Sequence, residues 1–241
     1  AENVAFLSRV PVLFVSLEMS GVELADRLLC SVARVNGHRL RTGNLSQEER
    51  HRLVRKTYEI SKSPLFVDDS PSRNISEIAA VARRIRQREK NLGLIVIDYL
   101  QLIEPDNSRD PRQEQVAKIA RRLKGLAREQ KAPVLCLSQL NRQAEEGKDH
   151  RPKMSQLRES GAIEQDADVV MFVHREEYYH RGDDALQYAG QAELIIAKQR
   201  NGPVGEIELT WEKDFTRFSD RAPARHSEFD NYSDFVTPGG F

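Results

Sequence analysis

Short, continuous runs of apolar residues recur along this chain and constrain its fold more than any other feature. The runs are rich in valine, isoleucine, leucine and phenylalanine, and they occupy residues 10–17, 65–67, 94–97, 134–137, 169–173 and 194–197. Unbroken apolarity over a few residues is typical of strands covered on both faces, as in a parallel sheet. We therefore expect a sheet that is mostly parallel.

Segments with helical periodicity separate the first four runs. Three of them begin with a capping-box spacing, in which an end residue and the side chain three positions later satisfy each other's backbone N–H groups. The pairs are Ser20 with Glu23, Ser46 with Glu49, and Asn74 with Glu77. A fourth helix is expected at about residues 114–130. Strands that alternate with helices predict an open α/β sheet with right-handed crossovers.

The pattern changes near the C-terminus. The run at residues 194–197, the turn residues Asn201, Gly202 and Pro203, and a further apolar stretch at residues 206–211 predict an antiparallel hairpin. Residues 220–241 lack apolar periodicity and contain prolines and glycines, so we expect a flexible tail there. Residues 1–219 then form one domain.

Charge and cysteine content exclude several classes of protein. Lysine plus arginine total 37 and aspartate plus glutamate total 37, so the net charge is zero and a nucleic-acid partner must be met by a local basic patch. No apolar stretch approaches the roughly 20 residues that a membrane helix needs, so we expect no membrane partner. The two cysteines lie in apolar segments, which favours buried thiols in a reducing, cytoplasmic compartment.

Polar residues follow three of the apolar runs directly. Glu18, Asp98 and Gln139 stand where ligands bind in open α/β sheets, beyond the carboxyl ends of the strands. Four aliphatics followed by an aspartate suit a Mg²⁺ ligand, a second carboxylate can deprotonate a water, and an amide can sense a γ-phosphate. Any single strand must meet polar residues on leaving a sheet; three such exits together favour nucleotide chemistry.

Two further segments each have a plainer and a functional interpretation. Residues 140–168 are polar, lack aromatic side chains and begin directly after Gln139. They form either a solvated surface loop or a segment that grips a nucleic-acid backbone without reading its sequence. Lys198 and Arg200 stand two apart on a strand, hence on one face. They form either an exposed edge or a pair of cations for a neighbouring subunit's triphosphate, which requires an oligomer.

Five segments in order resemble the motifs of the DnaB family of bacterial replicative DNA helicases, and the likeness extends to about Phe218. They occupy residues 16–20, 97–102, 137–142, 157–168 and 198–203. The resemblance implies a RecA-like ATPase core in a ring-shaped homohexamer around single-stranded DNA. It also implies 5′ to 3′ translocation driven by ATP and Mg²⁺, with primase and a helicase loader as partners at replication forks, in association with the nucleoid.

The resemblance also assigns roles to individual residues. It implies that Glu18 is the catalytic base, Asp98 the Walker B aspartate and metal ligand, and Gln139 the residue that relays nucleotide state toward DNA. Lys198 and Arg200 are expected to act in trans on the neighbour's γ-phosphate. The residues expected to contact the DNA backbone are Arg158, Glu159 and Gly161.

One departure from the family is large, because no G-x-x-x-x-G-K-[ST] phosphate-binding loop occurs in the sequence. In the family that loop lies shortly before the helix that residues 1–6 resemble. We therefore expect that the sequence starts just after the loop, as part of a longer helicase or as a naturally shortened relative. Residues 1–241 alone are expected to hydrolyse ATP negligibly. The alternatives are a non-catalytic binding module and another RecA-like ATPase.

Overall fold

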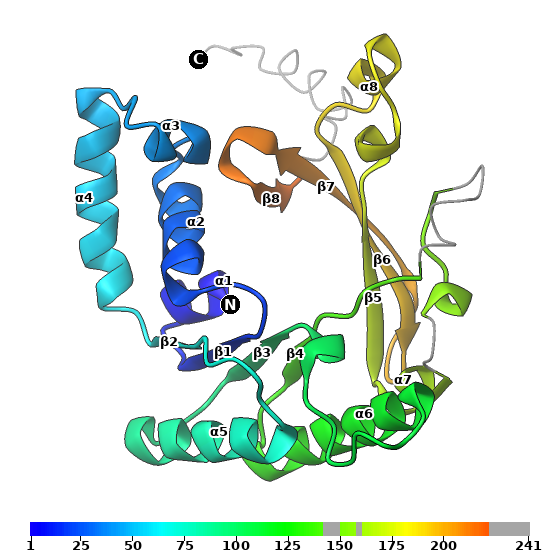
Figure 1. The fold of residues 1–241 in the computed structure, drawn as a ribbon. Coiled ribbons are helices and arrows are strands. Elements are labelled where there is room, and N and C mark those ends of the chain that lie inside the picture. Colours follow the sequence, from blue (N-terminus) through cyan, green and yellow to red (C-terminus); the bar gives the residue numbers. More distant parts are fainter. Residues whose placement is uncertain (142–149, 158–160, 222–241) are drawn as a thin grey trace, which may run out of the picture.

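A four-stranded parallel sheet forms one half of the molecule (Figure 1). The computed structural model describes residues 1–141, 150–157 and 161–221. The strands of this sheet are β1 (Val12–Ser16), β2 (Leu65–Asp68), β3 (Leu94–Asp98) and β4 (Val134–Cys136), in the order β2-β1-β3-β4. All three pairings are parallel, as the first four apolar runs predict.

α-Helices occur throughout the described residues, and the first six of them precede or connect the strands of this sheet. They are α1 (Glu2–Phe6), α2 (Gly21–Ala33), α3 (Gly37–Arg41), α4 (Gln47–Ser61), α5 (Ile75–Glu89), α6 (Arg112–Gln130), α7 (Gly161–Asp166) and α8 (Asp183–Gln187). Short 3₁₀ turns are η1 (Leu100–Leu102), η3 (Met154–Gln156), η4 (Glu176–Tyr179) and η5 (Lys213–Phe215). All three predicted capping boxes form, at the starts of α2, α4 and α5. At α2, the Ser20 N–H donates to the Glu23 carboxylate at 3.0 Å.

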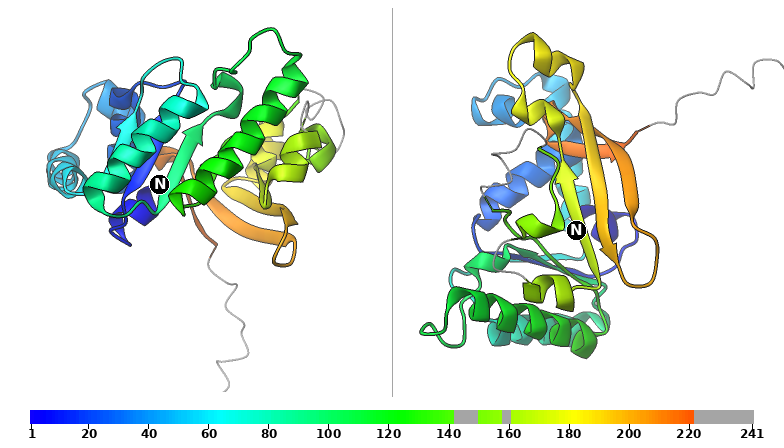
Figure 2. Two further views of the ribbon diagram at one scale, coloured as in Figure 1. Left: turned by 90° about the horizontal axis from the view of Figure 1, so that it is seen from below. Right: turned by 90° about the vertical axis from the view of Figure 1, so that its right-hand side faces the viewer.

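The main core lies between the parallel sheet and one pair of helices. Figures 1 and 2 show α5 and α6 side by side across one face of the sheet. Leu13, Ile95 and Ile97 point from β1 and β3 into this core and are fully buried. Ile78 and Val116 meet them from α5 and α6. Burying each such side chain contributes about 1.5–3 kcal/mol, and this packing fixes which residues lie at the ends of the strands.

The second half of the molecule is an antiparallel sheet of four strands. Its strands are β5 (Val169–His174), β6 (Gln191–Gln199), β7 (Gly205–Glu212) and β8 (Arg217–Asp220), in that order. The predicted hairpin is β6 and β7, so it belongs to a larger sheet than expected. The run at residues 169–173 was expected to be covered on both faces, and this is wrong. Val170 and Phe172 are buried, whereas Val169, Met171 and Val173 are exposed. β5 belongs to an antiparallel sheet, and only one of its faces is covered by other residues.

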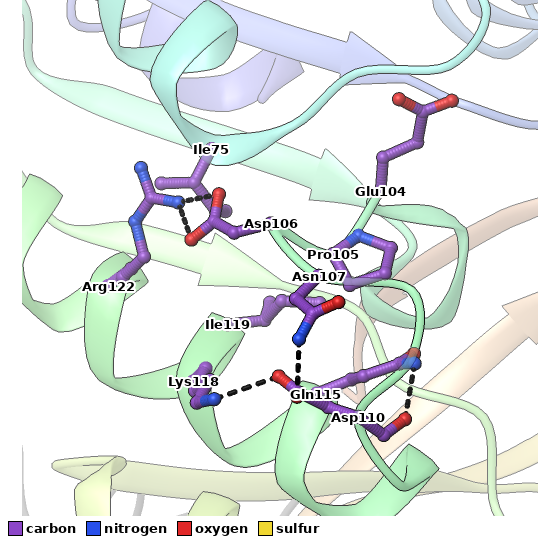
Figure 3. A pocket seen from close by; sticks show the side chains of 10 residues that line it. All are labelled: Ile75, Glu104, Pro105, Asp106, Asn107, Asp110, Gln115, Lys118, Ile119 and Arg122. Carbon is purple, nitrogen blue, oxygen red and sulfur yellow. Dashed lines mark hydrogen bonds and ion pairs between the residues drawn. The ribbon is translucent and has the colours of Figure 1, made fainter.

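The loop between η1 and α6 is fixed by polar contacts rather than shaped to take a ligand (Figure 3). Arg122 forms an ion pair with Asp106 and donates to the Ser76 hydroxyl at 2.7 Å. Lys118 contacts Asp110 at 2.8 Å. The cavity between these side chains measures about 10 Å³, which is room for about one water molecule. We therefore assign this pocket a structural role at the start of α6.

The expected tail lies almost entirely outside the described residues. Asp220, its first residue, is the last residue of β8 and pairs with Leu209. Arg221 then forms an ion pair with Glu208 at 3.2 Å. The boundary between domain and tail remains a prediction. Among the described residues, no helix combines the length and apolarity that crossing a bilayer requires.

The core packing makes a direct prediction about stability. Ile78 is fully buried on α5. We expect Ile78→Ala to lower the free energy of unfolding of the chain by about 2–5 kcal/mol, because it removes apolar contacts and leaves a cavity. Urea denaturation followed by far-UV circular dichroism measures this change. Val54→Ala on α4 is the control, since Val54 is 72% exposed, and equal midpoints for the two variants would contradict the assignment.

Candidate nucleotide and nucleic-acid site

The parallel sheet brings Glu18, Asp98 and Gln139 to one edge. Ser16 pairs with Asp98 in register, and Ile97 pairs with Cys136. The Leu17 N–H also donates to the Asp98 carbonyl at 2.8 Å, so the exits of β1 and β3 remain joined beyond the last paired residues. Because neighbouring parallel strands end at the same edge, the predicted residues of β1, β3 and β4 lie on adjacent exits.

The carboxyl group of Asp98 is in an environment that disfavours its charge. Asp98 is half-buried, and burial is the main reason that its pKa lies above the ordinary value. The negative charge of Glu18 raises the pKa of Asp98 further, while Arg27 on α2 opposes the shift. Glu18 itself is exposed. The edge therefore holds two electrostatically coupled carboxylates, and a cation placed between them would favour their ionised forms.

These residues suit Mg²⁺ better than a metal that needs a cage of side chains. The described part of the chain contains no group of three or more His, Cys, Asp and Glu residues arranged to hold a metal ion. Mg²⁺ commonly keeps several waters and takes only one or two carboxylates, with substrate phosphates as the other ligands. Asp98 fits that role with Glu18 beside it. These residues could therefore act as metal ligands, whereas residues 1–241 contain no glycine-rich phosphate loop beside them.

Gln139 is held in place by a residue that our sequence reasoning missed. The side-chain amide of Gln101 accepts from the Gln139 N–H at 3.3 Å and donates to the Gln139 carbonyl at 3.4 Å. It also donates to the Ser138 hydroxyl at 3.0 Å. Gln101 therefore pairs with the backbone of Gln139 as a neighbouring strand would. The sequence signal for this role of Gln101 is its position in the short 3₁₀ turn that follows Asp98.

Lys198 and Arg200 lie at the end of β6 and both reach the C-terminal end of α7. Lys198 Nζ donates to the carbonyls of Glu164 and Ala167, the latter at 2.8 Å. Arg200 Nη2 donates to the Gln165 carbonyl at 2.5 Å. The two cations therefore act on one side of the strand, as their spacing predicts. Their hydrogen bonds within the described residues go to this helix end and not to the carboxylates of the sheet edge.

The predicted DNA-contacting residues are described only in part. Gly161 is exposed and is the first residue of α7, whereas Arg158 and Glu159 lie outside the described residues. The helix that starts at Gly161 lies beside α6 (Figure 1). The structure thus connects Gly161, through one short helix, to the carbonyls that Lys198 and Arg200 contact.

Asp168 and Lys124 complete the polar cluster at the end of α7, and our sequence reasoning assigned neither of them a role. The Asp168 carboxylate accepts from Lys124 Nζ at 2.9 Å and lies 3.4 Å from Arg200 Nε. The hydrogen bond from Lys124 is the main reason that the pKa of Asp168 lies below its ordinary value. Lys124 comes from α6, far from Asp168 in sequence, so no local spacing signals this contact.

Solved structures identify the class of this domain. One of them, described as an ATPase domain, aligns with a TM-score of 0.86 at 35% identity and covers 92% of this chain and 78% of that chain. Another is described as the structure of a DnaB-like replicative helicase and its interactions with primase. It aligns with a TM-score of 0.85 at 34% identity and covers 90% of this chain and 52% of that chain. The fold is therefore that of the RecA-like helicase ATPase domains.

Sequence comparison then identifies the family. Residues 1–220 match the family described as DnaB-like helicase C terminal domain, and the chain belongs to this family. Two curated relatives are replicative DNA helicase DnaC of Bacillus subtilis and replicative DNA helicase DnaB of Geobacillus stearothermophilus. Each is 46% identical over 219 residues, which is 90% of this chain and 47% of the relative. The chain spans about half the length of these relatives, and the predicted resemblance is confirmed.

Proposed function

We propose that this chain is the motor domain of a hexameric replicative DNA helicase. In this role it couples ATP hydrolysis, with Mg²⁺, to 5′ to 3′ translocation on single-stranded DNA and to unwinding of the duplex. The observation that carries the proposal is the meeting of Glu18, Asp98 and Gln139 at the carboxyl edge of a parallel sheet, in a chain of the DnaB-like family. Ligands bind at this edge in open α/β folds.

Each residue of the edge has a chemical task in hydrolysis. Asp98 would hold Mg²⁺, which would supply neutralisation of the phosphate charge. Glu18 orients the attacking water and accepts its proton. Gln139 senses the γ-phosphate. The side-chain amide of Gln101 holds the backbone of Gln139 in position just beyond the end of β4.

The remaining tasks need a second subunit and DNA. Lys198 and Arg200 neutralise charge on the γ-phosphate bound by the neighbour, for which an arginine is well suited. In support, both cations lie at a strand end where their acceptors are backbone carbonyls and one exposed carboxylate. Arg158, Glu159 and Gly161 grip the DNA backbone. A chain with zero net charge needs such a local segment to hold DNA.

Primase and a helicase loader are the proposed protein partners, and the proposed location is the cytoplasm, at replication forks in association with the nucleoid. One solved relative is described with its interactions with primase, which supports the first partner. The alternatives to this proposal are a non-catalytic binding module and another RecA-like ATPase. Unwinding of a forked DNA by the full gene product separates the helicase from this module and from other RecA-like ATPases.

The missing motif yields the first functional prediction. Residues 1–241 alone are expected to show negligible ATP turnover with or without single-stranded DNA, because no backbone cradle holds the phosphates. A coupled phosphate-release assay measures this, with the Geobacillus stearothermophilus helicase as the positive control. DNA-stimulated turnover by residues 1–241 at the rate of that control would contradict the prediction.

Arg200→Ala tests the role in trans. In the full gene product we expect turnover to fall by about 10³-fold or more, because charge on the transferring phosphoryl group is no longer neutralised. Nucleotide binding, measured with a fluorescent ATP analogue, is expected to be retained. Arg221→Ala is the matched control, since Arg221 pairs with Glu208 and lies outside the site. A loss of binding as large as the loss of turnover would show a structural role instead.

Glu18→Gln tests the proposed base. It keeps the size of the side chain and removes the proton acceptor, so turnover in the full gene product is expected to fall about 10²–10⁴-fold. Binding of nucleotide and of DNA is expected to stay at the wild-type level. Glu114→Gln, on the exposed surface of α6, is the control and should turn over normally. Turnover by Glu18→Gln within a factor of two of this control argues against the assignment.

A further inference from the structure

The C-terminal end of α7 is held almost wholly by cationic side chains from other elements. A helix leaves its last carbonyls without partners inside the helix, and cations near that end are stabilising. Here three cations donate hydrogen bonds to four consecutive carbonyls. Lys198 donates to the first and the fourth, and Arg200 donates to the second. Lys124 Nζ donates to the third at 2.9 Å. The carbonyls belong to Glu164, Gln165, Asp166 and Ala167. Two of these three cations are the ones proposed to act on a neighbour's nucleotide.

Asp168 holds Arg200 at this helix end by two contacts. Its carboxylate lies 3.4 Å from Arg200 Nε, and its carbonyl accepts from the Arg200 backbone N–H at 2.9 Å. The Asp168 side chain is 62% exposed, and ion pairs in such positions are weak. Arg200 can therefore exchange this partner for a stronger acceptor without a large loss of free energy.

A helix as short as α7 depends on such contacts. It spans six residues, and isolated helices of that length are not stable in water. Its position therefore rests on its packing against α6 and on the cations that bind its carbonyls. Gly161 is at its other end, so a change at the carbonyls is transmitted to the segment proposed to contact DNA.

We propose that Asp168 is a positioning residue that keeps Arg200 against α7 until the triphosphate of a neighbouring subunit attracts it away. The triphosphate is the stronger acceptor, because it carries several full charges whereas a helix end carries about half of one. When Arg200 leaves, α7 loses a cap, and Gly161 is free to adopt the position in which it binds DNA. This inference rests on the proposed function, since it takes Arg200 to act in trans.

Thermodynamic linkage couples the engagement of Arg200 with the triphosphate to the binding of DNA, and the coupling is reciprocal. If the state with Arg200 engaged binds DNA more tightly, DNA must favour that state by the same factor. Asp168 then suppresses turnover in the absence of DNA and makes hydrolysis depend on DNA.

The test compares Asp168→Asn with wild type in the full gene product. Turnover without DNA is expected to rise about 5-fold or more, while turnover at saturating oligo-dT is unchanged, so that stimulation by DNA falls by the same factor. Affinity for oligo-dT without nucleotide, measured by fluorescence anisotropy, is expected to rise. Asp168→Glu keeps the charge and should restore the DNA dependence. Asp183→Asn, an exposed aspartate on α8, is the control.

Two results would overturn the inference. Equal loss of both rates in Asp168→Asn shows a purely structural role, and an unchanged ratio shows that Asp168 does not hold Arg200. If Arg200→Ala leaves turnover intact, the proposed function itself fails; if Arg200→Ala is inactive and only the ratio is unchanged, this inference fails alone.

A measurement without variants keeps the test independent of folding defects. Hydrogen exchange of the amides at residues 161–168 is compared in the wild-type gene product with ADP and with a non-hydrolysable ATP analogue, each with Mg²⁺. We expect faster exchange with the analogue, because α7 loses the cap that Arg200 supplies. Equal exchange in the two states contradicts the inference.

Discussion

The parallel pairing of β1 and β3 is the constraint on which the rest of the structure depends. It sets Ser16 opposite Asp98 and so brings Glu18 within electrostatic reach of the Asp98 carboxyl group. A slip of one residue in either strand would reverse which side chains face the core. Ile95 and Ile97 would then leave the core that α5 and α6 cover, and Val96, which is buried on the other face of β3, would take their side. The different packing on the two faces therefore fixes the register.

Much of this arrangement could be predicted because its signals are local. The capping boxes of Ser20, Ser46 and Asn74 mark helix starts within four residues, and each of the first four apolar runs overlaps one strand of the parallel sheet. The exits at Asp98 and Gln139 follow from the ends of those runs. The extent of the antiparallel sheet could not be predicted in this way, since an apolar run such as residues 169–173 does not reveal whether one face or two will be covered.

The contacts that connect the candidate site to the rest of the domain have no local signal. Gln101 contacts Gln139 only because Gln101 follows β3, Gln139 follows β4, and these two strands are neighbours in the sheet. Lys124 meets Asp168 only because α6 lies beside α7. Both are polar side chains that a sequence pattern assigns to the surface. Their roles depend on tertiary packing, which places a distant backbone or carboxylate within hydrogen-bonding distance.

The charges of the site are divided between two separate places in one chain. Glu18 and Asp98 form a negative pair whose mutual repulsion helps to raise the pKa of Asp98. Lys198 and Arg200 form a positive pair that contacts the carbonyls at the end of α7 and the exposed carboxylate of Asp168. On the proposed function, a head-to-tail contact repeated around a closed ring would present the positive pair of each copy to the nucleotide site of the next. The nucleotide would then be bound by residues of two subunits, so hydrolysis would alter the interface between neighbouring subunits as directly as it alters the site.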